Sequence, residues 1–109
     1  MTSIVKVLIP AKDAENAQTT QYTANGVRTI IDKFTGNNHT AGAVTLAINV
    51  VTVAGAAAAT NLIVTKTLQA GESYPFPEIV GMALEEGGFI STLAGAAASI
   101  GIRASGREI

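Results

Sequence analysis

Short stretches in which apolar and polar residues alternate recur along the whole chain, separated by turn-forming residues. The stretch 43–53 is the clearest, because large apolar residues occupy every second position from Val44 to Val50 and small or polar residues lie between them. After Val50 the large residues change to odd positions, which predicts a β-bulge or bend there. Similar patterns predict further strands at 4–9, 19–23, 27–34, 61–68, 89–93 and 99–104.

Turn-forming residues mark the expected connections between these strands. Asn25 and Gly26 tolerate the positive φ of a tight hairpin and would join 19–23 to 27–34. Alanine-rich residues 94–98 would join the last two strands as a second hairpin. Pro10 has no N–H to donate and is expected to end the first strand. Loops are expected at 36–42 and 54–60.

The stretch 69–81 concentrates Pro, Gly, aromatic and acidic residues. Residues that precede a proline favour extended backbone, and a proline suits the first position of a helix. The pattern therefore predicts an extended segment that lays its aromatic rings on the core, followed by a short helix near residues 77–84 that caps one end of the fold. We interpret this stretch as a structural hub, composed of Tyr74, Pro75, Phe76, Pro77, Ile79 and Val80.

Together these elements predict an all-β fold, a small antiparallel β-sandwich or jelly-roll-like arrangement of about six to eight short strands. Strand 27–34 carries apolar residues on both faces, which predicts that it is covered on both sides for part of its length. A chain of 109 residues favours one domain, residues 1–109, in which residues 1–18 form an N-terminal strand or arm.

Composition adds an expectation about partners. Charged residues make up 14% of the chain, against about 25% in an average soluble domain, and the net charge of -1 supplies little repulsion between copies. We therefore expect other protein to cover much of the surface; a tolerated Thr-, Asn- and Ala-rich β surface is the alternative. The charge balance offers no basic patch for nucleic acid. No apolar run is long enough for a signal peptide or a membrane span, so we expect a soluble protein without a membrane partner.

Residues that could carry chemistry are few. The chain has no Cys, which excludes disulfides and thiol catalysis, and its one histidine, His39, lies in a polar stretch without a second His. The pair Glu85 and Glu86 could in principle act on glycosides, but a catalytic cleft is not expected on so small a sandwich with so few aromatic residues. We predict that the protein is not an enzyme and has no catalytic residues, cofactor or metal.

Three segments carry a family resemblance: 22–35 (YTA…VRTIIDKFT), 70–81 (AGESYPFPEIVG) and 88–108 (GFISTLA…IRASGRE). With the Val- and Ala-rich strand between them, they resemble small virion structural proteins of tailed bacteriophages, of the capsid decoration or cement type. The resemblance covers most of the chain after residue 19.

This resemblance implies a protein made in the host cytoplasm that binds the outside of the phage head. There it would clamp major capsid protein subunits and associate with its own copies as a dimer or trimer. A tail or head-fibre module and a carbohydrate-binding module are the alternatives. A clamp needs free edges and loops, so the candidate contact residues are Ile4, Val5, Val7, Asn37, Asn38, His39, Ala56 and Ala57.

Overall fold

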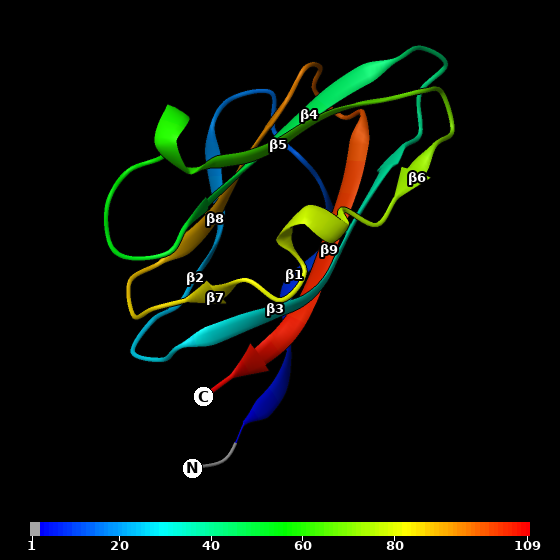
Figure 1. Ribbon diagram of the computed structural model, residues 1–109. Helices are drawn as coiled ribbons and strands as arrows, with labels where there is room; N and C mark the ends of the chain where they lie inside the picture. Colours follow the sequence, from blue (N-terminus) through cyan, green and yellow to red (C-terminus); the bar gives the residue numbers. More distant parts are fainter. Residues whose placement is uncertain (1–2) are drawn as a thin grey trace.

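The computed structural model describes residues 3–109, which form two antiparallel β-sheets packed face to face (Figure 1). We call them sheet A and sheet B. Sheet A has the strand order β1 (Ile4–Asp13), β9 (Ile100–Glu108), β3 (Thr29–Asn38), β6 (Ser73–Tyr74), and β7 (Ala83–Leu84) also pairs with β3. Sheet B has the order β2 (Thr19–Thr23), β8 (Phe89–Ala94), β4 (Val44–Val51), β5 (Leu62–Leu68). Two 3₁₀ turns, η1 (Ala59–Asn61) and η2 (Pro77–Ile79), lie in the connections.

The order of the strands is that of a jelly roll. The chain pairs β1 with β9, β2 with β8, β3 with β6 and β7, and β4 with β5, as a long hairpin would. This hairpin is then wound so that β9 pairs with β3 and β8 pairs with β4. β6 and β7 share one strand position, with η2 between them. The predicted all-β sandwich is therefore confirmed.

The core lies between the two sheets and consists mainly of aliphatic side chains with two phenylalanines. The alternation predicted in β4 is confirmed, because Leu46 and Ile48 are fully buried. The predicted bulge near Val50 is not in β4 itself, whose pairing with β8 is unbroken up to Val51. The register shifts instead in the pairing with β5, between Ile48 and Asn49, and the extra residue belongs to β5.

β3 is longer than predicted and changes its inward face along its length. Thr29 and Ile31 are buried, and the pairing with β9 then shifts register, so that Phe34 continues the buried series. The prediction that this strand is covered on both faces is therefore wrong. Its mixed apolar and polar pattern arises because a β-bulge changes which residues face the core. Residues 36–38, expected in a loop, belong to this strand. A β-carbon on Gly36 would lie 2.8 Å from Cε2 of Phe76, so this strand glycine leaves room for a core ring.

Both predicted hairpins are wrong, because β2 and β3, like β8 and β9, belong to opposite sheets. Gly26 does have the expected positive φ, 70°. Turn residues allow the chain to reverse, but they do not determine whether the next strand pairs with the previous one or crosses to the other sheet. β1 also continues past Pro10 to Asp13. The missing N–H is tolerated there because β1 is an edge strand with a register shift between Ile9 and Lys12.

The short helix predicted near 77–84 begins at Pro77 as expected, but it is the single 3₁₀ turn η2, which ends at Ile79 before the chain becomes β7. Gly81, at φ 87°, donates its N–H to the carbonyl of Ile31, and the N–H of Ile31 donates to the carbonyl of Met82. These bonds return the chain to the edge of β3 and end any helix.

Most of the expected hub is present. Phe76 and Ile79 are fully buried, and the ring of Phe76 contacts those of Phe34 and Tyr74 edge-on. Val80 is 46% exposed, so its expected place in the cap of the core is wrong. Pro75 and Pro77 are exposed, and Phe76, which precedes Pro77, is not extended as predicted but has a positive φ of 45°.

Candidate partner-binding surface

The first half of β1 carries three exposed large apolar side chains. Val5 is 81% exposed, Val7 64% and Ile4 61%, whereas Leu8 and Ile9 further along the strand are buried. Within the part of the chain that the structure describes, β1 pairs with β9 on one side only. In Figure 1 the first residues of β1 lie at the same end of the molecule as the C-terminus. An edge of this kind offers unpaired N–H and C=O groups together with β-branched side chains.

The side of β1 that pairs with β9 is held by a series of polar contacts. Lys6 of β1 lies 3.2 Å from Glu108 of β9, and Glu108 accepts a 2.5 Å hydrogen bond from the Tyr22 hydroxyl, which also contacts Thr29 at 2.7 Å. The Tyr22 bond lowers the pKa of Glu108. Burial, together with the nearby Glu108 carboxylate, raises the pKa of Tyr22 to about 12. The first half of β1 is thus fixed to the body on one side, while its other edge has no strand partner among residues 3–109.

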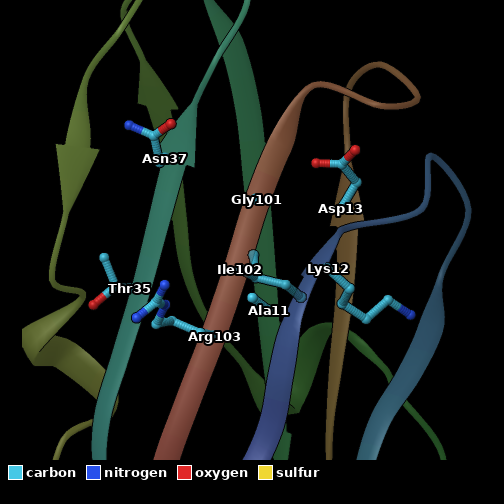
Figure 2. Close-up of a pocket in the computed structure, with 8 residues that line it drawn as sticks. All are labelled: Ala11, Lys12, Asp13, Thr35, Asn37, Gly101, Ile102 and Arg103. Atoms are coloured by element: carbon cyan, nitrogen blue, oxygen red, sulfur yellow. The ribbon is translucent and has the colours of Figure 1, made fainter.

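A shallow hollow of about 650 Å³ lies on the outer face of sheet A, beside this edge. Its wall on β1 is apolar, formed by Val7, Pro10 and Ala11, and its floor comes from β3 and β9. A second hollow of about 370 Å³, shown in Figure 2, continues it towards the far end of β1 and shares Ala11, Thr35 and Arg103 with it.

Most charged side chains near these hollows already have partners. Arg107 makes a two-pronged contact with Asp32, with distances of 3.0 Å from both Nε and Nη2. Lys12 lies 2.9 Å from Glu15, and the pKa of Glu15 is lowered to about 2 by hydrogen bonds from Lys12 and Gln21.

The remaining charges on this face divide into a bound pair and two unpaired cations. Asp13 is bonded to His39 at 2.7 Å. Among residues 3–109, Lys33 and Arg103 have no ion-pair partner. In Figure 2 the guanidinium of Arg103 reaches over β3 towards Thr35, whereas Lys12 and Asp13 point away from it.

The loop residues expected to contact a partner differ in accessibility. Asn38 is fully buried, so its predicted role as a contact residue is wrong. Its Nδ2 donates to the carbonyls of Gly42 (2.8 Å) and Leu68 (2.9 Å), and it thereby fixes the loop that follows β3. Asn37 is half-buried and donates to Ser73, while His39 is exposed but bonded to Asp13.

The loop before η1 lies beside a smaller hollow, of about 300 Å³, on the outer face of sheet B. Ala56 is exposed, and the half-buried Ala57 lines the hollow next to Leu62 and Leu93, which are exposed. The Asn61 side chain shapes the loop by accepting from Asn49 and from the Ala58 N–H, and by donating to the Ala56 carbonyl. Two of the predicted contact residues thus lie at a second, weaker apolar patch.

The sequence interpretation missed Lys33, Arg103 and the two hydroxyl residues beside them, Thr35 and Ser105. Each lies at an outward-facing position of an alternating strand, where Lys33 and Arg103 are exposed and Thr35 and Ser105 are half-buried; this alternation is the one signal the sequence contains. Their proximity depends on the register between β3 and β9, which pairs residues about 70 positions apart.

No cluster of three or more His, Cys, Asp or Glu side chains suited to a metal ion occurs among the described residues. Over the same residues 3–109, none of the helical segments is long and apolar enough to cross a membrane. Comparisons with protein-family models, with curated proteins and with solved structures found no match for this chain.

Proposed function

We propose that this protein is a non-enzymatic docking module that attaches to a larger protein assembly through the free edge of β1. The observation that carries the proposal is the exposure of Ile4, Val5 and Val7 on an edge strand whose outer side has no strand partner within residues 3–109. An edge strand binds a partner by adding a strand to its sheet, so that main-chain hydrogen bonds give affinity and alternate side chains give specificity. Contiguous exposed apolar residues are typical of such contacts.

Within this role we propose that the assembly is a phage head and that the protein decorates it, contacting the major capsid protein and further copies of itself. The support is the sequence resemblance of segments 22–35, 70–81 and 88–108, together with a sandwich of low charge. On a lattice of identical sites, modest contacts between single subunits add up to firm attachment.

The docking role of the β1 edge is tested by substituting lysines for its exposed valines. Val5→Lys with Val7→Lys removes two apolar side chains that bury on docking, each contributing about 1.5 kcal/mol or more. We expect binding to heads that lack the protein to fall about 100-fold, since every 1.4 kcal/mol is tenfold. Both side chains are exposed, so circular dichroism should report an unchanged fold.

Val53→Lys is the matched control, because Val53 is also exposed (56%) but lies in the loop after β4. It should bind heads as the unchanged protein does. Equal binding by the β1 variant, or an equal loss with Val53→Lys, contradicts docking through β1.

The assembly itself is tested by cryo-electron microscopy of purified virions. Density for this protein repeated over the whole head is the expected result. Density at the tail alone would replace decoration with the role of a tail module. Strong, selective binding of the isolated protein on a glycan array, with no density on the head, would instead assign a carbohydrate-binding module.

A further inference from the structure

We infer that the outer face of sheet A binds acidic side chains on an extended segment of a partner protein, and that Lys33 and Arg103 receive the carboxylates. The inference rests on the proposed docking role and names the chemistry of the partner, which that role leaves open. It does not depend on the partner being a capsid.

The register of β3 and β9 places four side chains in one block. Lys33 lies directly opposite Ser105, and Thr35 lies directly opposite Arg103. All four point away from the core and line the same hollow of about 650 Å³. The block therefore has a cation at each end of one diagonal and a hydroxyl at each end of the other. Diagonal neighbours on a sheet are roughly 7–8 Å apart, within reach of long side chains, so one carboxylate can contact both cations.

The charges around this block favour an arriving carboxylate. Arg107, Lys12 and Asp13 are each bonded to a partner of their own, which leaves the diagonal cations unneutralised within residues 3–109. A carboxylate that enters the hollow gains charge-assisted hydrogen bonds and breaks no existing ion pair. The Thr35 and Ser105 hydroxyls can donate to its remaining lone pairs.

The wall of the hollow indicates that the acid is carried on a polypeptide. Val7, Pro10 and Ala11 of β1 present an apolar flank directly beside the two cations. A polypeptide segment that carries both acidic and aliphatic residues satisfies both surfaces. Nucleic acid fits less well, because backbone binding needs many cations and single strands need aromatic stacking platforms. Among the described residues, the lining of the hollow offers two unpaired cations and no aromatic side chain.

The probe is a synthetic peptide, Thr-Val-Glu-Val-Glu-Val-Thr, titrated into the full chain labelled with nitrogen-15. We expect amide signals of Lys33, Thr35, Arg103 and Ser105 to shift, and the affinity to fall at least tenfold in the Arg103→Gln and Lys33→Gln variants. The same peptide with Gln in place of Glu should not bind, and added salt should weaken the binding of the Glu peptide.

Arg28→Gln is the matched control. It removes one positive charge from an exposed position that lines neither hollow of sheet A, so it should leave binding unchanged. The inference is overturned by equal binding of the Gln peptide, by the absence of shifts at millimolar Glu peptide, or by an oligothymidine that binds the block more tightly than the peptide does. If Arg103→Gln docks on its assembly normally while the Val5 and Val7 lysine variant does not, the docking role stands and the acidic partner is wrong.

Discussion

Gly36 and Phe76 provide a test of whether core packing requires a glycine in β3. A β-carbon on Gly36 would lie 2.8 Å from Cε2 of the Phe76 ring, closer than such contacts occur in proteins. The other nearest atoms, Cδ2 of Leu46 and Cγ2 of Ile100, would lie at 3.5 and 3.6 Å, which is ordinary packing distance. The ring alone therefore disfavours an alanine at this position.

The magnitudes follow from this geometry. Gly36→Ala should cost about 1–3 kcal/mol of unfolding free energy, as overpacking of a core does. Phe76→Ala should cost about 3–5 kcal/mol, because it deletes a fully buried ring. Once the ring is gone, Gly36→Ala should become stabilising by about 0.5–1 kcal/mol, since alanine loses less conformational entropy than glycine in a strand.

The assay is urea unfolding of both single variants and the double variant, followed by far-ultraviolet circular dichroism. Phe76→Leu supplies a milder second background, because leucine also lacks the Cε atom that blocks Gly36. The expected signature is a change of sign in the effect of Gly36→Ala between the backgrounds. Costs that agree within about 0.5 kcal/mol would mean that the two sites are independent, and would refute the reasoning.

Three further outcomes are expected. Gly106→Ala should cost about 3 kcal/mol or more by urea unfolding, because its β-carbon would overlap the backbone carbonyl oxygen of Ile30; a cost under about 1 kcal/mol contradicts this. The pKa of Tyr22 is raised to about 12, so the folded state favours the neutral phenol: its contribution to stability is complete below about pH 10 and is lost between about pH 10 and about pH 12. Tyr22→Phe should therefore show a smaller fall in melting temperature over that interval, and an identical fall would contradict the assignment. Asn38→Ala should cost about 1–3 kcal/mol, because two backbone carbonyls lose their donor, while Asn37→Ala, at a half-buried position, should cost clearly less; equal costs would count against the role of Asn38.

The sequence by itself determined the class of fold and much of the core. Alternation through β4 identified Leu46 and Ile48 as inward-facing residues, and Gly26 indicated a turn with positive φ. These features are local, because the two faces of a strand and the φ of a turn depend on side chains a few positions apart. The aromatic ring of Phe76 was likewise expected on the core, since few other large side chains were available to fill it.

Tertiary structure alone decided which strands pair. Backbone hydrogen bonds between strands do not depend on which side chains the strands have. The jelly-roll order therefore follows from burying the two sheets against each other and not from any local sequence pattern. The bulge in β3 changes which residues face inward. The turn η2 ends and β7 begins because the edge of β3 forms backbone hydrogen bonds there. For the same reason the block of Lys33 and Arg103 with its two hydroxyls exists only in the folded sheet, where register brings together residues that the chain keeps about 70 positions apart.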